Sequence, residues 1–158
     1  MRPSPFRRPP DRRRSPGQSL AEFAIVFPVL MLIIGATIQF GIIFWGQNTL
    51  SQVVRDTGRW AATQTNCKDS DSIISRANAI AGDSQLIGYN SAWTATNVSV
   101  SWPTNTDNTT DQCPPTKNTE VRFVHIAISH NVPIFFPFVP GNGLISASAD
   151  FRMEPTAP

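Results

Sequence analysis

Apolar residues dominate one long stretch near the start of the chain. No charged residue occurs between Phe23 and Val54, and the densest part is the 23-residue run Phe23–Trp45. A helix of that length spans about 34 Å, and the hydrocarbon core of a bilayer is about 30 Å thick. Because the run is apolar on all sides, it is typical of a membrane span, whereas a buried helix in a soluble protein is the alternative. We predict a transmembrane helix over residues 18–47.

Beyond this run the pattern becomes that of an amphipathic helix. One stripe at helical spacing consists of Leu50, Val53, Val54, Thr57 and Ala61. The stripe predicts that the first helix leaves the membrane, continues over residues 48–66 and packs on a small domain. A second helix is predicted over residues 72–82, with Asp71 or Ser72 as its N-cap and Gly82 at its end.

Three later segments alternate between apolar and polar residues with a period of two, which is typical of strands with one buried face. They are residues 94–102, 120–130 and 144–154. Strands that accompany a long N-terminal helix indicate an α+β architecture. We therefore expect an extracytoplasmic α+β domain over residues 67–158, with an antiparallel sheet of three or four strands.

The formal net charge of +2 is the average of two very different segments. Residues 1–17 carry six arginines and one aspartate, for +5, whereas the rest of the chain carries seven basic and ten acidic groups, for −3. The proline-rich and arginine-rich start can bury little apolar surface, so we expect a disordered leader. Basic flanks stay in the cytoplasm, which predicts a cytoplasmic N-terminus and an extracytoplasmic C-terminal domain. Basic charge on a short arm also argues against nucleic-acid binding.

A secretory signal peptide would share the basic start and the apolar run. The run in this chain is longer than the usual h-region of about 7–15 residues, and no A-x-A-type site closes it. The sequence therefore favours an apolar helix that stays in the mature chain as a membrane anchor.

The junction between leader and apolar helix carries a specific motif. Gly17 is followed at the fifth position by Glu22 and then by Phe23. This arrangement resembles the processing site of type IV prepilins, where the leader ends in glycine. Glycine has no side chain, so an extended backbone can enter a protease cleft closely. Four further elements resemble TadE-like pseudopilins in the same order: Glu22–Leu30, Gln39–Gly41, Asn48–Leu50 and Arg55–Ala62.

The resemblance, which covers about residues 15–62, implies a function and a set of partners. It implies that a prepilin peptidase cuts between Gly17 and Gln18 and so removes the leader. The mature chain would be a minor pseudopilin of a Tad/Flp-type (type IVc) pilus assembly system in the bacterial inner membrane. Its partners would be other pilins and pseudopilins and the inner-membrane assembly proteins. The protein would serve as a structural or priming component, with no cofactor and no small-molecule substrate.

Single residues of the apolar helix have physical roles of their own. A carboxylate at the membrane midplane costs about 2.5–3.5 kcal/mol and less at the edge, so Glu22 is expected to have a partner. After cleavage that partner is the new amine of Gln18, in the same or a neighbouring subunit, unless Glu22 faces lipid headgroups instead. In the resembling families this glutamate serves processing-linked methylation or subunit docking. Pro28 should kink or loosen the helix, and Gly35 and Gly41 allow close helix packing.

Two features of the predicted domain leave alternatives open. Cys67 and Cys113 can pair in an oxidising compartment, which would contribute about 4 kcal/mol, or they can stay free thiols. The apolar segment 133–140 either folds back over the core or forms an exposed patch for a partner or the membrane surface. The phenylalanines of that segment are Phe135, Phe136 and Phe138.

The sequence contains few features that are typical of an enzyme. It contains no G-x-S-x-G, H-E-x-x-H or Walker A motif. His125 and His130 lie five residues apart on a predicted strand and therefore on opposite faces, which argues against a shared metal. We predict that the chain is not an enzyme and binds no metal. The alternative to a pseudopilin is a signal-anchored extracytoplasmic binding protein that is never processed.

Overall fold

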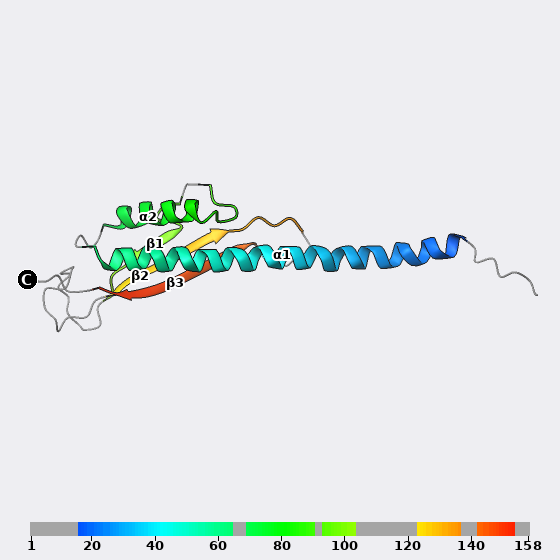
Figure 1. Cartoon of the computed structure of the whole chain (residues 1–158), viewed down its shortest axis with the longest axis horizontal. Coiled ribbons are helices and arrows are strands. Elements are labelled where there is room, and N and C mark those ends of the chain that lie inside the picture. Colours follow the sequence, from blue (N-terminus) through cyan, green and yellow to red (C-terminus); the bar gives the residue numbers. More distant parts are fainter. Residues whose placement is uncertain (1–15, 65–68, 91–92, 104–122, 137–141, 154–158) are drawn as a thin grey trace, which may run out of the picture. The chain divides into compact units, whose positions relative to one another are not determined.

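The computed structural model describes residues 16–64, 69–90, 93–103, 123–136 and 142–153. The elements in chain order are α1 (Pro16–Ala62), α2 (Ser70–Asp83), β1 (Val98–Ser101), β2 (Phe123–Asn131) and β3 (Leu144–Arg152) (Figure 1). The chain divides into an N-terminal unit, Met1–Gly35, and a C-terminal unit, Ala36–Pro158, and α1 contributes residues to both. Most of the predicted leader, together with Cys67, Cys113 and Phe138, lies outside the described residues.

In the N-terminal unit the described residues belong to α1, and their apolar side chains are exposed on all sides of the helix. The most exposed include Leu20, Phe23, Ile25, Val26 and Val29. The most apolar window of α1 has a mean hydropathy of 2.3 and is only 11% buried. Within the described part of the chain, α1 is the one helix long and apolar enough to cross a membrane. The helix is therefore unlike the core helix of a soluble protein, which would be mostly covered.

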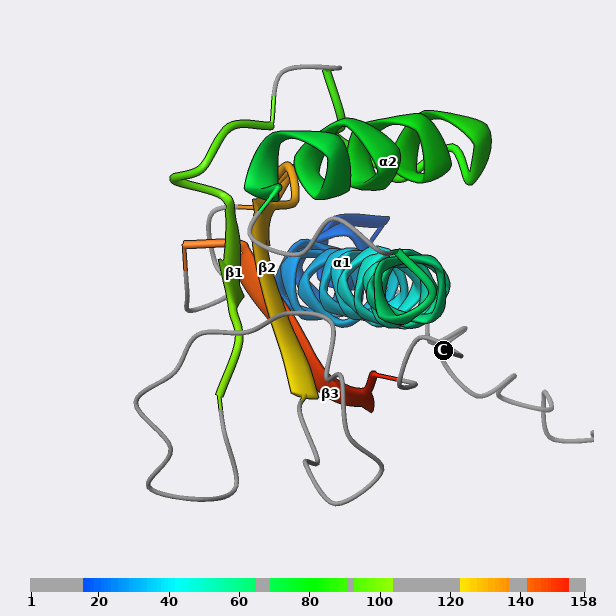
Figure 2. The ribbon, with the colours of Figure 1, turned by 90° about the vertical axis from the view of Figure 1, so that its left-hand side faces the viewer.

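The C-terminal unit contains a three-stranded antiparallel sheet in the order β1-β2-β3. Val98 of β1 pairs with Ile128 of β2, and Ile126 of β2 pairs with Ala149 of β3. The predicted α+β class, with a long N-terminal helix and an antiparallel sheet, is confirmed. Viewed along α1, the sheet lies on one side of the helix and α2 on a neighbouring side (Figure 2).

The core of this unit is built from one stripe of each element. In α1 the stripe is the one that helical spacing indicates, and each of its members is buried: Leu50, Val53, Val54, Thr57 and Ala61. The sheet contributes alternate residues of β2, and α2 contributes Ile73, Ala77 and Ala81. The same helix thus has exposed apolar residues on every side before Gly35 and a single buried stripe beyond Gly46.

Strand β3 runs alongside α1, in the same direction, and two glycines allow a close approach. A Cβ added at Gly46 would lie 3.0 Å from Val132 and 3.3 Å from Ile145, and one at Gly58 would overlap the ring of Phe151. Twelve helical residues span about 18 Å and six strand residues about 20 Å. The separation from Gly46 to Gly58 therefore matches that from Ile145 to Phe151, and the two elements stay in contact over this length.

Two predicted boundaries are wrong for local reasons. The second helix begins at Ser70, two residues early, because the Asp69 carboxylate accepts a hydrogen bond from the Ser72 backbone N–H at 3.1 Å and so caps it. Neither Asp71 nor Ser72 is the cap. The first strand begins only at Val98, because the backbone N–H groups of Asn97 and Val98 both donate to Thr94 O in a turn. Polar side chains and turns competed there with the alternating pattern.

We predict that Gly58→Ala destabilises the C-terminal unit. Overpacking against Phe151 costs about 1–3 kcal/mol, and the better helix propensity of alanine offsets at most about 1 kcal/mol of that. The measurement is thermal or chemical unfolding of the full chain in detergent. Gly82→Ala in α2 is the matched control, because the added Cβ would meet Tyr89 at an ordinary 3.6 Å. Equal stability of the two variants would show that the α1–β3 contact is not tight.

Candidate functional site

The predicted processing residues lie in the first two turns of α1. Gly17 is exposed and already helical, since α1 begins at Pro16, whereas entry into a protease cleft calls for an extended backbone. Glycine disfavours a helix by about 1 kcal/mol, and the first N–H groups of a helix have no partner within it. Unwinding the chain at Gly17 is therefore inexpensive.

Gln18 and Glu22 share one face of α1. The Gln18 side-chain amide, Nε2, donates a hydrogen bond to Glu22 Oε1 at 3.2 Å, and both side chains are exposed. Phe23 lies next to Glu22 and contacts Phe27, with ring centroids 5.3 Å apart. In the uncleaved chain the carboxylate thus has a neutral partner one turn away.

The predicted packing residues occupy ordinary helical positions. Pro28 lies within α1, and the backbone is helical on both sides of it. Gly35 belongs to the N-terminal unit and Gly41 to the C-terminal unit. A Cβ added at Gly41 would meet no atom of the described residues within 4 Å, so packing against that part of the chain does not require glycine there. Contact of Gly35 and Gly41 with another helix stays a prediction.

Gln39 has a structural role that the sequence pattern did not reveal. Its side chain is fully buried, although it stands in an apolar part of α1. Its Nε2 donates to the backbone carbonyl of Pro133 at 3.1 Å, and its Oε1 accepts from the backbone N–H of Phe135 at 2.9 Å. Both halves of the amide are used, so Gln39 fixes the start of the apolar segment 133–140 to the helix.

The described part of that segment, residues 133–136, is only partly covered. Phe135 is 65% exposed and Phe136 is half-buried. Val132, just before the segment, is buried, and its N–H donates to Gly143 O at 2.9 Å. Gly143 has φ +70 and lies against the carbonyl of Val132, so only glycine fits this turn.

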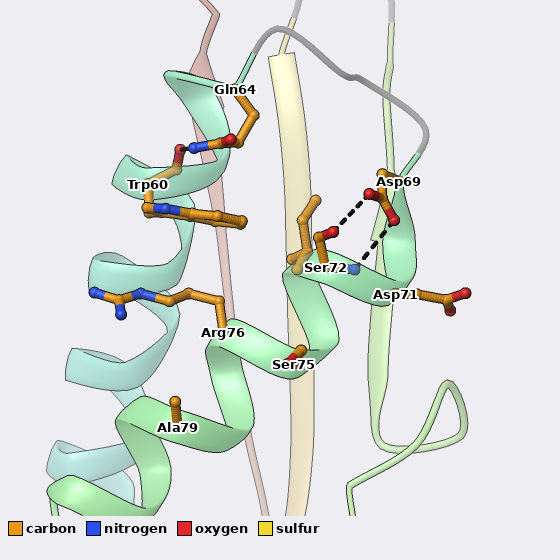
Figure 3. A pocket seen from close by; sticks show the side chains of 9 residues that line it. Trp60, Gln64, Asp69, Asp71, Ser72, Ser75, Arg76 and Ala79 are labelled. Atoms are coloured by element: carbon orange, nitrogen blue, oxygen red, sulfur yellow. Dashed lines mark hydrogen bonds between the residues drawn. The ribbon is translucent and has the colours of Figure 1, made fainter.

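A groove of about 570 Å³ lies between the end of α1 and the first turns of α2 (Figure 3). Among its lining residues are Trp60, Gln64, Asp69, Asp71, Ser72 and Arg76. Hydrogen bonds from the Ser72 hydroxyl and backbone N–H hold the pKa of the Asp69 carboxyl below its usual range. That carboxylate caps α2, and Gln64 Nε2 donates to the backbone carbonyl of Trp60. These contacts stabilise helix ends and do not form a nucleophile and base pair.

The two histidines lie on opposite faces of β2, as their spacing predicts. His125 is partly exposed and contacts Asp150 across the sheet, with Nδ1 and Oδ1 2.7 Å apart. His130 is buried, and both ring nitrogens are used: Nδ1 accepts from the Trp93 indole at 3.3 Å, and Nε2 lies 2.8 Å from Ile87 O. Among the described residues, no three His, Cys, Asp or Glu side chains are grouped to hold a metal ion.

Comparison with known proteins shows which family the helical region resembles. The family model described as TadE-like protein matches residues 17–59, which is about a quarter of the chain. The match begins at Gly17 and ends within the last turn of α1, so it confirms the resemblance that the motifs indicated. No curated protein and no solved structure matches the chain.

We predict that His130→Ala destabilises the C-terminal unit by about 1–3 kcal/mol, because the buried Trp93 N–H and Ile87 carbonyl lose their partner. His125→Ala is the matched control on the same strand. Its pair with Asp150 is exposed, and such pairs are worth about 1 kcal/mol or less. Unfolding of both variants in urea is the measurement. An equal loss in the two variants would show that the buried contacts contribute no more than the exposed pair.

Proposed function

We propose that the chain is a minor pseudopilin of a Tad/Flp-type pilus assembly system. In this role it is cut after Gly17 by a prepilin peptidase, held in the membrane by α1, and used as a structural or priming part. The TadE-like match carries the proposal, because it begins at Gly17 and includes the glutamate and aromatic residue that follow a prepilin cut. The family suggests an association with Tad pili, and the finer role is our inference.

The surface of α1 supports a membrane location. In the N-terminal unit its apolar side chains have no cover within the described residues, and Glu22 is the one charged residue among the described residues before Arg55. We infer a single pass through the bacterial inner membrane, with the leader in the cytoplasm and the sheet outside. Cleavage then takes place at the cytoplasmic edge and removes all six leader arginines.

Cleavage changes the charge next to Glu22. Before the cut, the carboxylate accepts a hydrogen bond from the neutral Gln18 side chain. Afterwards the α-amine of Gln18 carries a positive charge one helical turn from Glu22, in the same subunit or in a neighbour. A carboxylate near hydrocarbon gains most from such a counter-ion, so we expect cleavage to favour docking of Glu22 against the new amine.

We predict that the mature protein begins at Gln18 in cells with an active prepilin peptidase. Gly17→Arg should abolish the cut, because a long charged side chain replaces the hydrogen that lets the backbone approach a protease cleft closely. Mass spectrometry of the intact purified protein gives the N-terminus. Ser15→Arg is the matched control, since it adds the same charge to the leader but keeps the glycine.

An intact leader in the wild-type chain would contradict the proposal and favour a signal-anchored extracytoplasmic binding protein. Loss of cleavage in Ser15→Arg as well would show that leader charge, and not the glycine, controls processing. Deletion of the peptidase gene should leave the wild-type leader in place.

We further predict that the Glu22→Gln variant is cleaved normally but co-purifies with fewer partner subunits. The substitution keeps the shape and removes the charge that pairs with the Gln18 amine. The measurement is co-purification of other pilins and assembly proteins from detergent-solubilised membranes. The Glu22→Asp variant keeps the charge and should therefore retain most of the co-purification. Undiminished co-purification with Glu22→Gln would remove subunit docking from the role of this residue.

A further inference from the structure

The segment that begins at Pro133 is fixed to α1 at a defined height. Gln39 holds it through the Pro133 carbonyl and the Phe135 N–H. Gln39 precedes Trp45 by six residues, which is about 9 Å along a helix. Residues 133–135 therefore lie beside a part of α1 that is more than one helical turn nearer to its N-terminus, and so to the apolar span, than Trp45.

Trp45 marks the expected outer boundary of the span. Tryptophan is enriched where the bilayer meets water, and the polar residues Gln47 and Asn48 follow directly. Gln47 Nε2 donates to the backbone carbonyl of Ser146 at 2.8 Å, so the end of the sheet lies at the height of this boundary. By the same measure the Gln39 contact lies about 9 Å on the membrane side of Trp45, near the boundary between headgroups and acyl chains.

The surface around this contact is apolar and uncovered in the described structure. Phe135 is 65% exposed, and Ile134 beside it and Leu144 at the start of β3 are also exposed. On α1 the neighbouring positions are similar, with Ile38, Phe40, Phe44 and Trp45 each about half exposed or more. No charged residue occurs in α1 between Phe23 and Val54 or in the segment 133–140. Exposed apolar residues grouped in this way are typical of a surface that a partner or a membrane covers.

The hydrogen bonds of Gln39 satisfy two backbone groups of the segment, the Pro133 carbonyl and the Phe135 N–H, and the remaining ones can meet headgroups and water at the membrane boundary. Backbone polar groups at membrane depth must be satisfied within the protein, because lipid offers no partners. Gln39 supplies an acceptor to the Phe135 N–H and a donor to the Pro133 carbonyl, and Pro133 has no N–H to satisfy. Its own amide is fully buried by the same contacts, so no polar group of Gln39 faces the apolar surroundings.

We propose that residues 133–136 lie at the boundary between headgroups and acyl chains in the outer leaflet beside α1, and that Gln39 holds them there with the Phe135 ring inserted toward the acyl chains. The partner of this patch is thus the lipid itself. The segment would fix how deeply the C-terminal unit lies on the bilayer, which a single helix alone does not determine. This inference rests on the proposed membrane span.

Photocrosslinking tests the inference on the full chain. Benzoylphenylalanine is placed at position 135, 25 or 99, one at a time, and each protein is reconstituted in phosphatidylcholine vesicles. Irradiation followed by mass spectrometry measures the yield of lipid adduct. Ile25 is an exposed residue of the apolar part of α1 and reports the span itself, and Ser99 is an exposed residue of β1 that should face water.

The expected result is a lipid adduct at position 135 with a yield close to that at 25 and far above that at 99. Adduct at 25 without adduct at 135 would overturn the inference while the span stands. Crosslinks from 135 to a second protein chain would also overturn it. No adduct at either position would refute the span and the inference together.

A second variant tests the part of Gln39. Gln39→Leu makes α1 more apolar but removes both hydrogen bonds to the segment. The Pro133 carbonyl and the Phe135 N–H then lose their partners, so the adduct yield at 135 should fall roughly tenfold, the factor expected for one unpaired backbone group. An unchanged yield, with the adduct at 25 intact, would remove Gln39 from the proposal.

Discussion

The close contact between α1 and β3 is the constraint on which the C-terminal unit depends. Because Gly46 and Gly58 lack side chains, the strand approaches the helix backbone at both ends of their common length. This contact sets the position of β3, and the antiparallel register then sets β2 and β1 in turn. The buried stripe of α1 supplies the other half of the core, with α2 beside it. A bulky side chain at either glycine would separate the layers that all other contacts join.

One helix therefore serves two different surroundings. In the N-terminal unit, α1 offers apolar side chains on every side, which suits lipid and leaves little to pack within the chain. Beyond Gly46 the same helix is amphipathic, with charged residues such as Arg55 and Asp56 exposed. Gln39 is the exception to both patterns, since it is polar, buried and fully hydrogen-bonded in an otherwise apolar stretch.

Local sequence patterns predicted the elements but not the contacts between them. The period-3.6 stripe of α1 and the alternation in β2 and β3 appear directly in the chain, so the fold class followed from the sequence. The starts of α2 and β1 did not follow from the pattern, because Asp69 and Thr94 bind nearby backbone N–H groups. The contacts of Gln39 with Phe135 and of Gly58 with Phe151 join residues more than 90 positions apart, and no local pattern contains them. The proposed processing residues rest on the motif alone, because the chemistry of such a cut lies in the peptidase that would recognise them.

The parallel course of β3 along α1 also has a mechanical consequence. A load applied to the helix axis, as in a part that is pulled or pushed within a membrane-embedded machine, acts along the contact and not across it. The Gly46 and Gly58 ends would then share the force in shear, and no single end would peel away first. Within the C-terminal unit, β3 would therefore stay on α1 until the whole length of the strand slipped at once.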